Sequence, residues 1–218
     1  MFMKNKVKIK RIIDLIMLLL MPLLMAYSLI GEMFHEIAGT VLFVLFIVHH
    51  IMNRRWYGSI KKGRYTLLRA VTTVIDILLI VIMLSLPVSG ILMSRYVFKF
   101  LPSAGNISLI RTVHLLAAFW GFVLLSLHAG MHVKAMLNAV KKPVVVRWIR
   151  IAGLIAGVYG IYAFYKRQLG TYMFMRSHFI MLPFDEPVIF YLLDYCAIMV
   201  MFMMVSYIFT CIVQKRVK

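Results

Sequence analysis

The sequence predicts an all-α integral membrane protein, a helical bundle of about six transmembrane helices. Of the 218 residues, 63% are hydrophobic and only 15% are charged, a composition that excludes a soluble globular domain. Several apolar runs reach the roughly 20 residues that a helix needs to cross the hydrocarbon core of a bilayer. None shows the ten-residue alternation of a membrane β-barrel. We therefore expect one membrane domain over residues 1–218.

Six apolar runs fit this reading, and we take them in chain order. They are Ile12–Ile30, Met33–Met52, Arg69–Met93, Leu109–Leu137, Trp148–Tyr165 and Val188–Val213. The basic N-terminus before the first run resembles a signal peptide, but no small-residue cleavage site follows at residues 26–31. We expect an uncleaved first span. The turn at Gly31 is so short that the first two helices must form an antiparallel hairpin.

The later runs carry their own local signals. Pro87 and Gly90 near the end of the third run predict a kink or a close backbone approach. Gly153 and Gly157 form a GxxxG pattern, which is typical of tight helix packing. The aromatic and charged residues of 166–187 predict a lid at the membrane surface. No segment outside the runs is longer than about two dozen residues, which excludes a nucleotide-binding domain, so NAD(P)H or FAD could act only through a partner.

The formal net charge of +18 is first explained by membrane topology. Nineteen of the 25 Lys and Arg residues lie before the first run, in residues 54–69 and 134–150, and in the tail, whereas six lie in the alternate loops. The positive-inside rule then predicts that both termini are cytoplasmic. We expect a lipid bilayer as the surroundings and no nucleic-acid partner.

Histidines recur at matched positions in the second and fourth runs. His35 and His49 are fourteen residues apart, and so are His114 and His128. On a helix this spacing leaves each pair about 40° apart around the axis and roughly 21 Å apart along it. Because the two runs cross in the same direction, His35 matches His114 at the outer face and His49 matches His128 at the inner face.

Two imidazoles at each level could hold a haem as a six-coordinate, low-spin group that carries electrons and binds no substrate at iron. We therefore expect two haem b groups, with His35, His114, His49 and His128 as iron ligands. His50 adjoins His49 and His132 lies one turn beyond His128, so either could replace its neighbour as ligand. Arg54, Arg95 and Arg111 are candidates to pair with haem propionates. Arg54 is better explained by the ordinary enrichment of Lys and Arg at the cytoplasmic ends of membrane helices.

Ionisable residues inside a membrane are usually functional. Carboxylates near the histidine levels therefore make a quinone a further candidate ligand. A quinol releases protons with its electrons, and Glu32, Glu36 or Asp76 could accept them. The 18 Met residues are more simply explained as apolar filling than as ligands. His178 is expected to be a surface residue, with a docking or quinone role as the alternative.

These motifs resemble a known family. The four-helix part, residues 10–138, is similar to the dihaem core of the cytochrome b superfamily. More closely, HEIAGTVLFVLFIVHHIMNRRWY, SGILMS at 89–94 and the fourth-run histidines resemble the flavinylation-associated cytochromes of bacterial membranes. The resemblance implies a bacterial cytoplasmic membrane, two b-type haems, and electron exchange between a membrane pool or cytoplasmic donor and flavin-carrying extracytoplasmic partners. It leaves out the two additional helices in residues 147–214. A six-helix ferric-reductase-like core fits less well, because the fifth run has no histidine.

Together these observations predict transmembrane electron transfer between a quinone pool or redox partner at one face and a flavin- or haem-carrying partner at the other. The chain would be an electron-transfer component or membrane subunit of an oxidoreductase, and quinol oxidation is one form this could take. The alternative is a histidine-lined transporter or channel for protons or metal ions. Between their histidines the second and fourth runs are apolar, which favours the haem protein.

Overall fold

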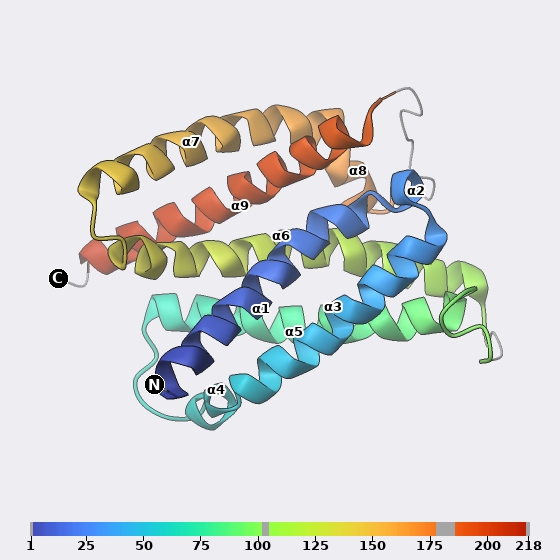
Figure 1. Cartoon of the computed structure of the whole chain (residues 1–218), viewed down its shortest axis with the longest axis horizontal. Helices are drawn as coiled ribbons and strands as arrows, with labels where there is room; N and C mark the ends of the chain where they lie inside the picture. Colours follow the sequence, from blue (N-terminus) through green and yellow to red (C-terminus); the bar gives the residue numbers. More distant parts are fainter. Residues whose placement is uncertain (1, 102–104, 178–185, 217–218) are drawn as a thin grey trace.

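The computed structural model describes residues 2–101, 105–177 and 186–216 (Figure 1). All regular secondary structure in these ranges is helical, which confirms the all-α fold class. The long helices are α1 (Phe2–Met25), α3 (Glu32–Met52), α5 (Leu67–Met93), α6 (Ile107–Asn138), α7 (Pro143–Lys166) and α9 (Val188–Arg216). Short helices α2 (Tyr27–Ile30), α4 (Arg55–Ser59) and α8 (Leu169–Met173) lie in the connections.

Local sequence signals explain where the long helices begin. The Thr66 side chain accepts a hydrogen bond from the Arg69 amide at the start of α5, and the Asn106 side chain accepts from two amides at the start of α6. These caps satisfy amides that have no partner inside the helix. Pro143 opens α7 at the one helical position where its missing amide hydrogen costs nothing.

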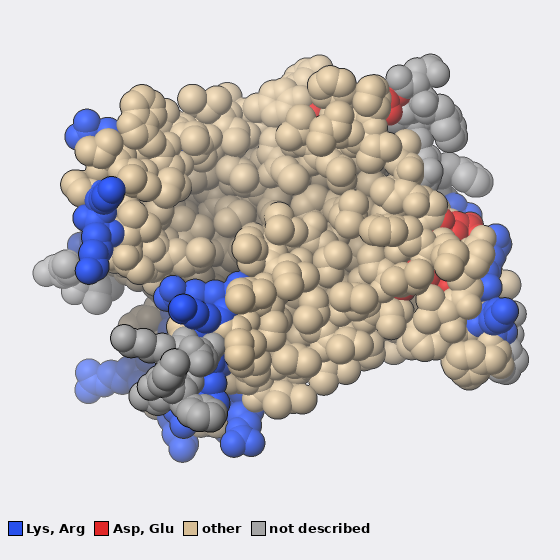
Figure 2. Space-filling model, in the orientation of Figure 1, with Lys and Arg blue, Asp and Glu red and all other residues tan. Residues whose placement is uncertain are grey.

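Five helices are long and apolar enough to cross a membrane. They are α3, α5, α6, α7 and residues Val188–Lys215 of α9. Many of their large apolar side chains, such as Leu78 and Ile155, are exposed on the surface of the bundle. Figure 2 shows a broad belt without charged side chains across the middle of one face. The chain is therefore a multi-pass membrane protein surrounded by lipid.

The first expected span, Ile12–Ile30, differs from the prediction. The helix there starts at Phe2, includes the basic N-terminal residues and ends at Met25, and Ala26 separates it from α2. Pro22 lies inside α1 and cannot donate to the preceding turn, and the Ala26 amide bonds to Leu23, three residues back. Among the described residues α1 does not qualify as a candidate span, so five spans rather than six are shown.

Four of the long helices form a closed group. α1 packs against α3, α3 against α5, α5 against α6 and α6 against α1. The helices that carry the predicted ligands, α3 and α6, therefore lie diagonally across the group. α9 packs between α6 and α7, so the two C-terminal helices lie along one side of the group (Figure 1).

Small residues allow the C-terminal helices to pack closely. A Cβ atom on Gly130 would overlap the Met203 backbone, and one on Gly160 would overlap the Ala197 carbonyl. The expected GxxxG contact is present, because Gly157 faces Met201 of α9. The tightest approach of α7, however, lies at Gly160, one turn further along.

The bundle has two distinct ends. We call the end with both termini, α4 and residues 139–142 the basic end, because Lys and Arg gather there (Figures 1 and 2). The opposite end carries α2, α8 and the described residues between α5 and α6, which are 94–101 and 105–106. At this end Leu169 and Tyr172 are buried against α6 and α7, so this part of the expected lid is packed into the bundle. His178 and the rest of that segment, 178–185, lie outside the described residues.

Candidate functional site

The opposite end brings His35 and His114 together. Their ring centroids are 6.2 Å apart and the ring planes are inclined by 68°. His35 lies in the first turn of α3 and His114 in the second turn of α6. The Nδ1 atom of His35 is buried and has no hydrogen-bond partner. Residues separated by about 80 positions thus meet as the matched helix depths predict.

A hydroxyl group determines the tautomer of His114. Ser89 on α5 donates its hydroxyl hydrogen to the Ser85 carbonyl at 2.7 Å, in the usual pattern of a serine inside a helix. Its oxygen is 2.9 Å from the Nδ1 atom of His114. Since the hydroxyl has a single hydrogen, the oxygen accepts from Nδ1–H. This leaves the Nε2 lone pair of His114 free to bind a metal.

The residue after Ser89 completes the contact with this imidazole. A Cβ atom on Gly90 would lie 3.6 Å from the Cε1 atom of His114, so the α5 backbone passes close to the ring. The close approach predicted near Gly90 is therefore present. α5 itself continues past Pro87 to Met93.

Glu36, the neighbour of His35, is bound by a turn of backbone. Its carboxylate accepts hydrogen bonds from the backbone amides of Arg95, Tyr96 and Val97 at 2.7–3.0 Å, and from the Ser94 hydroxyl at 2.6 Å. Three successive amides aimed at one anion form a nest that holds the negative charge in place. Glu36 thus fastens the end of α5 to the start of α3, beside the histidine pair.

Tyr27 joins the same region from α2. Its ring contacts His35 with centroids 5.1 Å apart, and its hydroxyl donates to Glu32 at 2.7 Å. Burial and the adjacent Glu32 carboxylate raise the pKa of Tyr27 to about 12, so it stays a neutral donor. Arg95 approaches Glu32 at 3.6 Å and is exposed, and Arg111 lies at the same end. Arg54 is exposed at the basic end.

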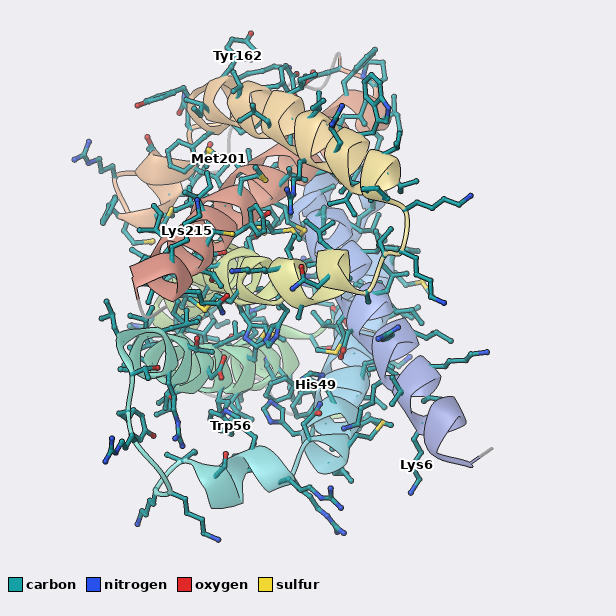
Figure 3. All side chains as sticks on the ribbon, turned by 90° about the vertical axis from the view of Figure 1, so that its left-hand side faces the viewer. Lys6, His49, Trp56, Tyr162, Met201 and Lys215 are labelled. Atoms are coloured by element: carbon teal, nitrogen blue, oxygen red, sulfur yellow. The ribbon has the colours of Figure 1, made fainter. Side chains whose placement is uncertain are left out.

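The basic end holds the other four predicted histidines together with two carboxylates. The Nδ1–H of His49 donates to Asp14 of α1 at 2.7 Å, and the Nδ1–H of His128 donates to Asp76 of α5 at 2.7 Å. Figure 3, which looks onto this end, shows His49 beside the neighbouring helices of the bundle. Carboxylates that hold the Nδ1–H of an imidazole are typical partners of metal-binding histidines, because they orient the free Nε2.

The two alternative ligands have different surroundings. His50 bonds to the Tyr57 hydroxyl at 2.6 Å, and its electrostatic neighbours are His49, Asp76 and His128. His132 is exposed and its ring contacts His128, with centroids 4.9 Å apart. At this end the ring contacts join neighbours on one helix, His49 with His50 and His128 with His132. Unlike His35 and His114, the expected pair His49 and His128 shows no ring contact among the described residues. His49 and His128 each have a carboxylate partner of their own, whereas among the described residues His50 and His132 have none.

Within the described ranges, no three His, Cys, Asp or Glu side chains are arranged to hold a metal ion. This disfavours a site of the structural zinc type, which needs four protein ligands. A haem needs only two, because the porphyrin supplies the other four donors.

A surface pocket of about 440 Å³ also lies at the basic end. Its lining includes Trp56, Lys62, Arg69, Thr72 and Thr73. Arg69 is held by the Ser59 and Arg64 carbonyls and by the Tyr65 ring. These contacts give Arg69 a structural role in the connection between α4 and α5.

Sequence reasoning missed a buried ionic cluster between α7 and α9. Asp194 is fully buried and accepts from Tyr159 at 2.6 Å and from Arg167 at 2.8 Å. Lys166 and Arg167 also pair with Glu186 at 2.9 and 2.7 Å. These two cations lower the pKa of Glu186. An isolated Asp in an apolar run was the available signal, but its partners are 27 to 35 positions away.

The chain matches no known family model, no curated protein and no solved structure.

Proposed function

We propose that this protein is a dihaem b-type cytochrome that carries electrons across the membrane. The observation that carries the proposal is the meeting of His35 and His114 at the opposite end, with ring centroids 6.2 Å apart. Two imidazoles bound at about 2 Å to opposite sides of one iron have ring centres roughly 6 Å apart. The pair therefore has the spacing that a bis-histidine haem requires.

The hydrogen bonds support the same function. Ser89, Asp14 and Asp76 each hold the Nδ1–H of one predicted ligand, respectively His114, His49 and His128. Each bond leaves Nε2 as the metal-binding atom, as at metal sites generally. His49 and His128 are the better-supported ligands at the basic end, with His50 and His132 as their neighbours.

Because α3 and α6 lie diagonally across the group of four helices, both histidine levels would lie between the same two helices. The fourteen-residue spacing separates the levels by roughly 21 Å along each helix, most of the hydrocarbon thickness. Haem supplies one-electron chemistry at each level. His35, His114, His49 and His128 would hold the two haems at fixed depths and leave no position at iron for a substrate.

Charge distribution supports an orientation and partners. The basic end would be cytoplasmic, so that His49 and His128 lie near the cytoplasmic face. Electrons would enter from a quinol or redox partner at one face and leave to a flavin- or haem-carrying partner at the other. Glu36 is a poor proton acceptor for a quinol, because four hydrogen bonds stabilise its charged form.

An ion path lined by histidines is less well supported. Between the two histidine levels the interior is filled by Leu42, Phe46, Met83 and Phe122, which belong to one apolar core. An ion crossing this core would lose its hydration without gaining polar partners.

Histidine variants purified from haem-replete cells test the proposal. We expect His114→Ala and His128→Ala each to retain about one haem per chain, because each removes one axial ligand at a different level. His50→Ala and His132→Ala are the matched controls and should retain both. If both His114→Ala and His128→Ala retained two haems per chain, the paired arrangement would be contradicted.

A further inference from the structure

The two histidine levels differ in the charge of the groups that hold them. At the basic end both predicted ligands donate to carboxylates, Asp14 and Asp76, at 2.7 Å. At the opposite end His114 donates to the neutral hydroxyl of Ser89, and the Nδ1 of His35 has no partner. Two anionic groups thus hold the predicted ligands at the basic end, whereas one neutral hydroxyl holds a predicted ligand at the opposite end.

The two carboxylates differ in their exposure to solvent. The Asp76 side chain is 13% exposed and lies on α5 between α3 and α6, whereas the Asp14 side chain is 49% exposed. Solvent screens an exposed charge much more than a buried one. Asp76 is therefore the stronger influence on its histidine.

Several other charged side chains near the two levels have partners of their own or are exposed. At the basic end Lys10 is directed to the Asn53 side chain, and Arg54 and Arg55 are exposed. At the opposite end Glu36 is a carboxylate next to His35 in the sequence, but its hydrogen bonds go to three amides and a hydroxyl and not to either imidazole. Glu32 is offset by Arg95 at 3.6 Å.

A carboxylate that accepts the Nδ1–H of an axial histidine makes that histidine a stronger electron donor to the metal. A more basic ligand and a nearby negative charge both stabilise the ferric state, which carries one more positive charge than the ferrous state. Both effects lower the reduction potential of the haem so ligated.

We infer that Asp76, assisted by Asp14, gives the basic-end site the lower reduction potential, so that electrons pass favourably from the basic end to the opposite end. The inference rests on the proposed function and adds a direction to it. One electron moves from the basic-end site, which is oxidised, to the opposite-end site, which is reduced, and no bond or proton is exchanged. Asp14 and Asp76 are positioning residues, since they act through His49 and His128.

Redox titration of the purified holoprotein, followed in the haem absorption bands, tests the inference. We expect two components with separate midpoint potentials in the wild type. His114→Ala should lose the higher-potential component and retain the lower one, and His35→Ala serves as the second variant if His114→Ala does not fold. Asp76→Asn should shift the lower potential upward, and Asp14→Asn should shift it upward by less.

Asp194→Asn is the matched control. It removes another buried Asp charge near the start of α9, away from the basic end, and should leave the basic-end potential unchanged. The inference is overturned if His114→Ala retains the higher-potential component, or if Asp76→Asn leaves the basic-end potential where it was. A wild-type protein without haem would instead overturn the proposed function.

Discussion

Ser89 acts on a single proton, the one on Nδ1 of His114. Its hydroxyl hydrogen points to the Ser85 and Leu86 carbonyls of its own helix, and with the hydrogen directed there its oxygen accepts from the imidazole. Partners of this kind affect metal affinity strongly, because a histidine in the other tautomer presents a hydrogen instead of a lone pair.

We therefore expect Ser89→Ala to weaken haem retention at the opposite end by about 10- to 100-fold, the usual cost of losing such a partner. The measurement is the rate of haem loss from the purified protein to an excess of a haem-free acceptor protein. Ser85→Ala is the matched control, because within the described ranges its half-buried hydroxyl bonds to the Val81 carbonyl of its own helix and to no histidine. Equal rates in the two variants would show that Ser89 does not position His114.

Glu36 shows how a carboxylate near a candidate site can be structural. From the sequence, its place beside His35 suggested a proton acceptor for a quinol. In the structure its oxygens are occupied by the amides of residues 95–97 and by Ser94. The first and last residues of the SGILMS segment therefore both act at the opposite end of the bundle. Ser89 holds His114, and Ser94 helps to hold Glu36 next to His35.

At the scale of elements, α7 and α9 pack through glycine. Gly160 lies against the Ala197 carbonyl, where a methyl group would overlap backbone, whereas Gly153 faces the flexible Met204 side chain at 3.4 Å. Close approach through small residues is a main source of helix association in membranes.

We expect Gly160→Ala to destabilise the protein by about 1–3 kcal/mol, as overpacking of a tight contact does. Gly153→Ala, the matched control on the same helix, should change stability much less, because Met204 can move. Thermal unfolding in detergent, followed by circular dichroism, provides the comparison. A Gly160→Ala protein as stable as the Gly153→Ala protein would contradict the close packing of α7 on α9.

Hydropathy and histidine spacing predicted much of the fold. Apolar runs gave five of the spans to within a few residues, and the fourteen-residue spacing predicted that His35 would meet His114. Helical periodicity fixes depth and direction within one helix, so such pairs can be found from sequence.

The rest depends on contacts between distant segments. Asp14 lies 35 positions from His49, and Asp76 lies 52 positions from His128, so nothing local marks these carboxylates as histidine partners. The division of the first run at Ala26 was also missed, although Pro22 was a local signal for it. The ionic cluster around Asp194 could not be assembled before α7 and α9 were placed side by side.

For the molecule as a whole, the central claim is that two levels of paired histidines hold two haems inside one membrane bundle. The most direct measurement is the reduced-minus-oxidised absorption spectrum of the wild-type protein, purified from haem-replete cells, together with its haem-to-protein ratio. The account predicts the bands of a low-spin, bis-histidine b-type cytochrome and about two haems per chain. Protein that purifies folded but without haem would contradict it.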